Sequence, residues 1–131
     1  MNFLMKTLGS KKKLKRLYRA SEHKFEAFHK FCDDKVDTLT LVRTEFGKII
    51  GGYTHYPWTS SNSWSEIKNW EKQTFLISLD MKETFVPQDE DGDNLMYCHK
   101  DYGPCFGGKF FPFFQGRGTD LCLMNNGRGR S

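Results

Sequence analysis

The pattern of apolar and polar positions is helical in the first quarter of the chain. Between residues 22 and 32, the apolar side chains of Phe25, Phe28 and Cys32 recur at helical spacing, which predicts one amphipathic helix. Ser21 directly precedes this stretch. Its hydroxyl is suited to accept a hydrogen bond from a free backbone N–H of the first turn, so we expect Ser21 to be the N-cap.

The next stretch follows the two-residue period of strands. Residues 38–44 alternate and are rich in β-branched side chains, and residues 48–54 form a second such run after a short turn at 45–47. This spacing predicts a β-hairpin. The glycine pair at positions 51 and 52 predicts either a β-bulge or a place where another element packs closely against the backbone.

The rest of the chain predicts short strands joined by irregular segments. Residues 55–72 predict a long connection with a turn of helix at 66–70, residues 89–94 predict a loop, and residues 102–118 are too rich in glycine and proline to assign. Further strands are expected at 74–79, 84–86, 95–98 and 120–124. One helix followed by many short antiparallel strands favours an α+β domain built as a β-sandwich with flanking helices.

Composition supports a folded chain with an unusual N-terminal segment. Hydrophobic residues make up 37% of the 131 residues and include 12 Phe, which is enough for a Phe-rich core. Residues 1–19 contain seven basic and no acidic side chains, which leaves 13 basic against 16 acidic residues in the remainder. We therefore expect a basic segment at 1–15, either a frayed tail or the end of a surface helix, and a body that does not bind nucleic acid.

The four cysteines are expected to be thiols. The apolar start of the chain stops at Lys6, too early for a secretory signal, and no run has the length of a membrane helix. We therefore predict a cytoplasmic protein whose cysteines are reduced and buried, namely Cys32, Cys98, Cys105 and Cys122.

No cofactor or metal site is predicted. The separation of Cys98 and Cys105 does not fit a zinc knuckle, and adjacent Cys98 and His99 would point to opposite faces of a strand. The acidic residues from Asp89 to Asp93 do not have the glycine and glutamate positions of an EF-hand loop.

No catalytic residue is predicted either. The histidines at positions 23, 29, 55 and 99 do not lie next to a nucleophile motif, and no serine has the flanking glycines of a nucleophile elbow. The tryptophans at 58, 64 and 70 suit either partner anchors or core residues that pin a long loop, and the sequence does not distinguish these roles.

The basic cluster suggests several roles. Clustered lysines and arginines favour a solubilising tail, and they also suit a nuclear-localisation patch or weak contact with an anionic surface. The residues concerned are Lys11, Lys12, Lys13, Lys15 and Arg16.

An ordered series of motifs resembles the TLDc domain family. The series comprises Leu17 to Ser21, Phe25, Phe28-His29, Cys32-Asp33, Thr38 to Val42, Phe46 to Thr54, Pro57-Trp58, Phe75 to Asp80, Tyr97 to His99, Tyr102 to Pro104, Phe106 to Gly108 and Asp120-Leu121. It spans residues 16–126 and leaves 127–131 as a polar tail.

This resemblance implies a β-sandwich of two antiparallel sheets in a eukaryotic, non-enzymatic interaction domain. Relatives are oxidation-resistance and membrane-traffic proteins, several of which act on the vacuolar proton pump (V-ATPase), so a V-ATPase subunit is the implied partner. Two departures are expected, namely extra sequence at 109–118 and a sandwich that is incomplete at the C-terminus. The alternatives are a thiol-based antioxidant or hydrolase-like enzyme, suggested by the cysteines and histidines, and a truncated fragment without function.

Overall fold

The chain forms an α+β structure dominated by antiparallel strands. The computed structural model describes residues 2–9, 13–24, 27–60, 63–64, 74–85, 96–107, 119–124 and 129–130. Its helices are α1 (Asn2–Leu8), α2 (Ala20–His23) and α3 (Phe28–Cys32). Its strands are β1 (Thr38–Arg43), β2 (Ile49–Thr54), β3 (Ser63–Trp64), β4 (Thr74–Ser78), β5 (Glu83–Phe85), β6 (Tyr97–Cys98), β7 (Tyr102–Gly107), β8 (Thr119–Met124) and β9 (Gly129–Arg130).

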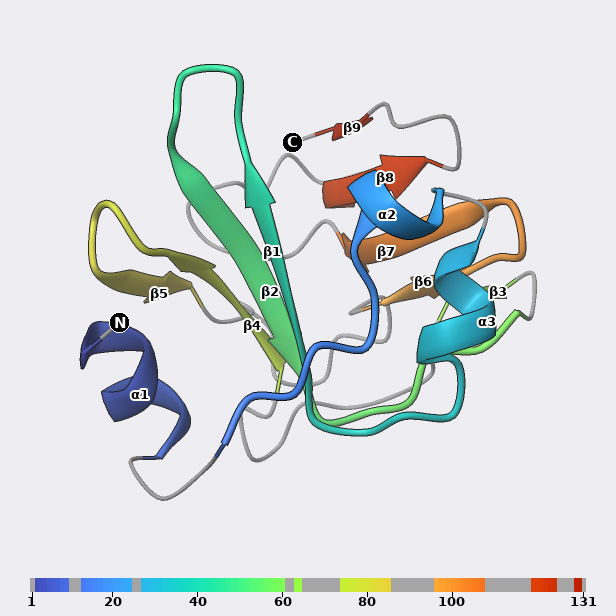
Figure 1. Ribbon diagram of the computed structural model, residues 1–131, viewed down its shortest axis with the longest axis horizontal. Coiled ribbons are helices and arrows are strands. Elements are labelled where there is room, and N and C mark those ends of the chain that lie inside the picture. Colours follow the sequence, from blue (N-terminus) through green and yellow to red (C-terminus); the bar gives the residue numbers. More distant parts are fainter. Residues whose placement is uncertain are drawn as a thin grey trace.

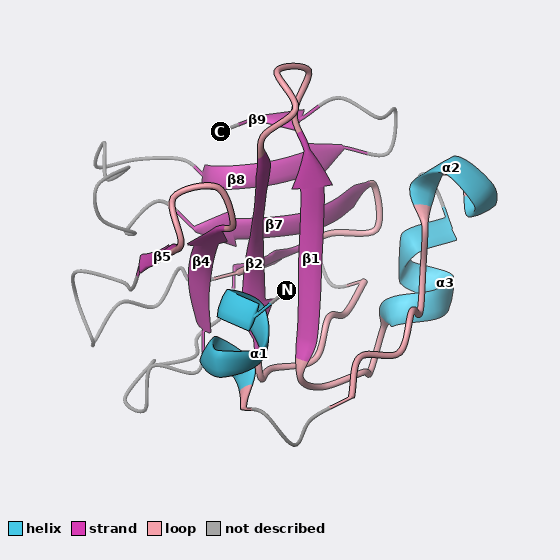
Figure 2. Cartoon of the chain, turned by 60° about the vertical axis from the view of Figure 1, so that its left-hand side comes forward, coloured by secondary structure: helices cyan, strands magenta, loops and turns pink. Residues whose placement is uncertain are grey.

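The strands form three groups, shown in Figure 1. The largest is a four-stranded antiparallel sheet in the order β1-β2-β4-β5, so β1 lies at one edge. A three-stranded sheet has the order β7-β8-β9, and β3 pairs with β6. Helices α2 and α3 lie beyond β1, on the side away from β2 (Figure 2).

The β1–β2 hairpin confirms the sequence prediction to within one residue at the turn. Gly47 has a φ of +79°, which glycine adopts at no steric cost, and its N–H donates to the Thr44 carbonyl. Strands β1 and β2 pair without a register shift, from Thr38 opposite Thr54 to Arg43 opposite Ile49. The prediction of a β-bulge at the glycine pair is therefore wrong. The other prediction, that another element packs closely against the backbone there, is correct, because the Phe106 ring lies where a side chain at Gly52 would extend.

The single helix predicted over residues 22–32 is wrong. The chain instead forms α2 and α3, separated at Lys24, whose φ of 65° and ψ of 152° are not helical. The Tyr18 hydroxyl donates to the Lys24 carbonyl at 2.6 Å, which holds this break in place. Ser21 is consequently inside α2 and is not its N-cap, a position that Arg19 takes without a side-chain hydrogen bond.

The other strands agree with the sequence where the apolar pattern is clear. Strands β4, β5, β6 and β8 lie within the predicted stretches or within one residue of them. Helix α1, β3, β7 and β9 occupy stretches where no regular element was firmly assigned. The predicted helical turn at 66–70, the loop at 89–94 and the extra sequence at 109–118 all lie outside the described residues.

Aromatic side chains from three separate segments form the centre of the core. The Trp58 ring meets Phe28 of α3 and Phe106 of β7 edge-to-face, with ring centroids 5.7 and 5.5 Å apart. This geometry adds to the free energy of burial. The expected Phe-rich core is therefore partly correct, and Trp58 is one of its central residues. The side chain of Trp64 and the whole of Trp70 are outside the described part.

Candidate functional site

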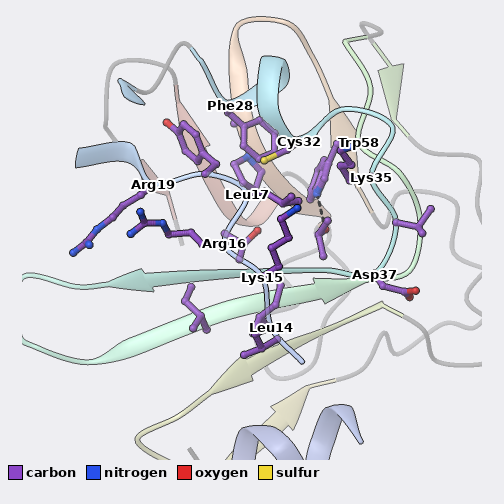
Figure 3. Close-up of a pocket in the computed structure, with 18 of the residues that line it drawn as sticks. Leu14, Lys15, Arg16, Leu17, Arg19, Phe28, Cys32, Lys35, Asp37 and Trp58 are labelled. Carbon is purple, nitrogen blue, oxygen red and sulfur yellow. Dashed lines mark hydrogen bonds between the residues drawn. The ribbon is translucent and has the colours of Figure 1, made fainter. Parts of the chain in front are cut away.

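A cleft of about 830 Å³ lies between β1 and the extended segment that precedes α2. Residues 13–20 form one wall, and residues 34–41, which include the first strand positions of β1, form the other. In Figure 1 this segment crosses the lower ends of β2 and β1 and then rises toward α2 on the side of β1 away from β2. Figure 3 shows Phe28, Cys32 and Trp58 grouped together at one end of this cleft.

The surface of the cleft is largely apolar. Phe28, Cys32 and Trp58 are buried, with exposed fractions of 6% or less, and form a rigid base. Three further apolar residues of the cleft are exposed to solvent, namely Leu14 at 49%, Val36 at 52% and Leu41 at 43%. Exposed apolar side chains next to a packed base are typical of a binding surface.

Basic side chains surround this apolar surface. Lys13, Lys15, Arg16, Arg19 and Lys35 line the cleft, against only two acids, Asp34 and Asp37. Arg16 and Arg19 both contact the Glu22 carboxylate, at 3.0 and 3.7 Å. The three lysines have no salt bridge among the described residues, and Lys15 points toward the end where Trp58 and Lys35 lie (Figure 3). The cleft therefore favours a ligand with negative charge.

His29 fixes the base of the cleft to the second half of the chain. Its Nε2 lies 2.6 Å from the His99 carbonyl and 2.7 Å from the Tyr102 carbonyl, and its Nδ1 lies 2.6 Å from Oδ1 of Asp33. All three partners are acceptors, so the ring joins them as a hydrogen-bond donor. This nearly buried ring thus connects α3 to the turn before β7 and to the first residue of β7.

Replacing His29 by leucine is expected to destabilise the fold by about 2–3 kcal/mol, because it leaves two carbonyls and a carboxylate without their donor. Urea unfolding followed by tryptophan fluorescence measures this loss. His55→Ala is the matched control, since the His55–Asp37 pair is 45% exposed on both sides and should contribute under about 1 kcal/mol. Equal losses for the two variants would contradict the role assigned to His29.

A second polar cluster lies where the cleft meets the end of the hairpin. Oδ1 of Asp37 accepts hydrogen bonds from the Tyr53 hydroxyl at 2.8 Å and from Nδ1 of His55 at 2.7 Å. Burial, followed by the hydrogen bond and the charge of Asp37, raises the pKa of Tyr53 to about 12. Asp37 has a φ of +55°, which aspartate tolerates better than most residues. The cluster holds the chain entering β1, and it places no nucleophile beside His55 among the described side chains.

The cysteines only partly agree with the prediction of four buried thiols. Cys32 and Cys98 are buried and free, as expected. Cys105 is disulfide-bonded, which corrects the prediction. The β7–β8 register places the backbone of Cys122 directly opposite that of Cys105.

Cys32 lacks the properties of a reactive thiol. Desolvation by burial, with a smaller contribution from the Asp33 charge, raises its pKa to about 11. Only the thiolate is nucleophilic, so a raised pKa lowers reactivity at neutral pH. This finding counts against Cys32 as the centre of a thiol-based antioxidant enzyme.

We expect iodoacetamide to alkylate Cys32 of the folded protein slowly. The rate should rise with pH until about 11, whereas in urea it should level off near the ordinary value of 9. At neutral pH the folded form should have about 100-fold less thiolate. Mass spectrometry of the peptide containing Cys32 measures both profiles, and a folded profile that levels off at pH 9 or below would contradict the prediction.

The histidines considered for catalysis lie in separate surroundings. His23 packs against Phe31, with ring centroids 4.6 Å apart, whereas the His99 ring lies 5.0 Å from that of Tyr102. Across the described residues, no three His, Cys, Asp or Glu side chains are placed to hold a metal ion together. The acidic residues 89–93 lie outside the described part. Each histidine that the structure describes packs against another ring or forms a hydrogen bond.

The cleft was not anticipated from the sequence. The sequence shows the basic cluster at residues 11–16, but not its position beside the outer edge of β1. Lys11 and Lys12 lie outside the described residues, and contact of this cluster with an anionic surface stays a prediction. Of the helices that the structure describes, none combines the length and apolar character needed to cross a membrane.

Together, these features define an α+β domain with one candidate binding cleft among the described residues. Comparison with known families agrees, because the TLDc domain model matches residues 1–123. The chain belongs to the TLDc domain family, whose members are generally non-catalytic interaction domains associated with oxidative stress. No curated protein matches the chain.

Proposed function

We propose that this chain is a protein-interaction domain that binds a V-ATPase subunit and supports resistance to oxidative stress. Membership in the TLDc family supports this proposal, because the resemblance implies relatives that act on the proton pump. The cleft is consistent with it, since an apolar base with a basic border suits a protein partner better than a reaction. The proposal includes a eukaryotic source, a cytoplasmic location and the two-sheet β-sandwich that the family resemblance implies.

Retention of pump subunits by the immobilised chain tests this role. The purified chain is incubated with the purified soluble sector of the V-ATPase, and a full-length TLDc protein is the positive control. We expect both to retain the same subunit. Retention by the full-length protein alone would overturn the proposal for this chain.

A further inference from the structure

Among the residues that the structure describes, no strand pairs with the outer edge of β1. The Thr44 N–H donates to the Lys48 carbonyl at 2.8 Å across the hairpin. In an antiparallel pair, alternate residues point their N–H and C=O groups toward the partner strand. Counting back from Thr44, the backbone groups of Leu39, Leu41 and Arg43 therefore point away from β2. No backbone hydrogen bond reaches these three residues from elsewhere in the described part.

The cleft lies directly against this edge. Leu39 and Leu41 both line it, and the segment 13–20 forms the opposite wall. An added strand lies about 4.8 Å from its neighbour and advances about 3.3 Å per residue, so the contact along residues 37–41 accommodates four or five residues. The dimensions therefore suit one extended peptide segment.

The charged side chains of the cleft indicate which kind of peptide segment would bind there. Lys13, Lys15 and Lys35 are exposed and have no salt bridge among the described residues. Of the two acids in the lining, Asp37 already accepts hydrogen bonds from Tyr53 and His55, and Asp34 lies next to Lys35 in sequence. Successive side chains of a strand point to opposite sides. In a segment of alternating acidic and apolar residues, the acidic side chains would therefore contact the lysines and the apolar side chains would contact the apolar base.

We propose that the cleft binds an extended acidic segment of a partner protein, which adds to the free edge of β1 as a further antiparallel or parallel strand. The backbone groups of Leu39 and Leu41 pair with the segment, and Lys15 and Lys35 contact its carboxylates. This inference rests on the proposed role as an interaction domain and names its mode of binding.

The direct test uses a fluorescein-labelled, end-capped peptide of sequence Glu-Val-Glu-Leu-Glu-Val-Glu and the full chain, with anisotropy as the readout. Saturable binding is expected. A Lys-Val-Lys-Leu-Lys-Val-Lys peptide should not bind, because its charge matches that of the cleft. An acidic peptide methylated at alternate backbone nitrogens should bind at least about tenfold more weakly, because it lacks the donors of an added strand.

Charge reversal in the cleft tests the lysines. The Lys15→Glu, Lys35→Glu double variant should weaken acidic-peptide binding about tenfold or more. The matched control is the Lys48→Glu, Lys82→Glu double variant, which changes the net charge equally at exposed positions that do not line the cleft. The control should change affinity by no more than about threefold. Equal weakening by both pairs, or full binding of the methylated peptide, would overturn strand addition.

A proline at position 41 tests the edge itself. Leu41→Pro removes an N–H that faces away from β2, so the hairpin keeps its pairing while the edge loses a donor. Tryptophan fluorescence verifies the fold, and loss of peptide binding is expected. A dimer of the native chain that this variant dissociates would assign the edge to a second copy and overturn the proposal. Binding to phosphatidylserine vesicles in place of the peptide would overturn it as well.

Different results would contradict the V-ATPase proposal and the strand-addition proposal. If the pump subunit is retained equally by the native chain and by the Lys15→Glu, Lys35→Glu variant, the cleft is not the binding surface and the interaction role stands. If the acidic peptide binds but no pump subunit is retained, strand addition stands and the V-ATPase partner is wrong.

Discussion

Replacing Gly51 by alanine is expected to abolish the native hairpin. An added Cβ would overlap the carbonyl oxygen of Thr40, would lie only 3.0 Å from the carbonyl carbon, and would crowd a Leu41 methyl group at 3.1 Å. Backbone atoms cannot move aside as a side chain can, so β1 must separate from β2. We expect a loss of at least about 4 kcal/mol, the range that marks a severe structural conflict.

Circular dichroism and urea unfolding of the Gly51→Ala variant measure this effect. Gly47→Asn is the matched control in the same hairpin, because nothing lies within 4 Å of a Cβ at Gly47 and asparagine tolerates its φ of +79°. The control should lose under about 1 kcal/mol. A cooperative unfolding transition for Gly51→Ala close to that of the native chain would show that the two strands do not pack as described.

Replacing Trp58 by alanine is expected to cost about 3–5 kcal/mol. The Trp58 side chain is 1% exposed, lies edge-to-face with two phenylalanines, and donates from Nε1 to the Thr38 hydroxyl at 3.0 Å. Its removal leaves a cavity at the base of the cleft. Thermal unfolding monitored by circular dichroism measures the loss.

Two partial replacements separate the contributions of Trp58. Trp58→Phe keeps most of the apolar volume and loses the hydrogen bond, so it should cost about half as much as alanine. Thr38→Val removes only the hydroxyl acceptor and should cost about 1 kcal/mol. If Trp58→Ala were no more destabilising than Thr38→Val, Trp58 would not be a central core residue.

Local chemistry explains what the sequence could reveal of the fold. The β1–β2 hairpin follows from two alternating runs and a glycine turn, all within 17 residues. The break between α2 and α3 was missed because it depends on the hydrogen bond from Tyr18 to the Lys24 carbonyl, which a helical period does not contain. Strand β7 was missed because its glycine and proline are atypical of strands.

The cleft could not be predicted because its walls are distant in sequence. Residues 13–20 and 34–41 face each other only after α2 and α3 turn the chain back, and Gly103 and Pro104 join them from β7. A family resemblance supplies the class of the domain but not this arrangement. The lysines were visible as a charge cluster, whereas their position beside an unpaired strand required the structure.

The His29 contacts also limit the order in which parts of the chain can fold during synthesis. The acceptors of its ring, the carbonyls of His99 and Tyr102, are 70 and 73 residues further along the chain. At a translation rate of roughly 5–20 residues per second, α3 is synthesised several seconds before those carbonyls exist. Until then only its contacts with Trp58, made 30 residues after Phe28, can hold it. Helix α3 therefore completes its docking only after the chain has grown past residue 102, although it is made early.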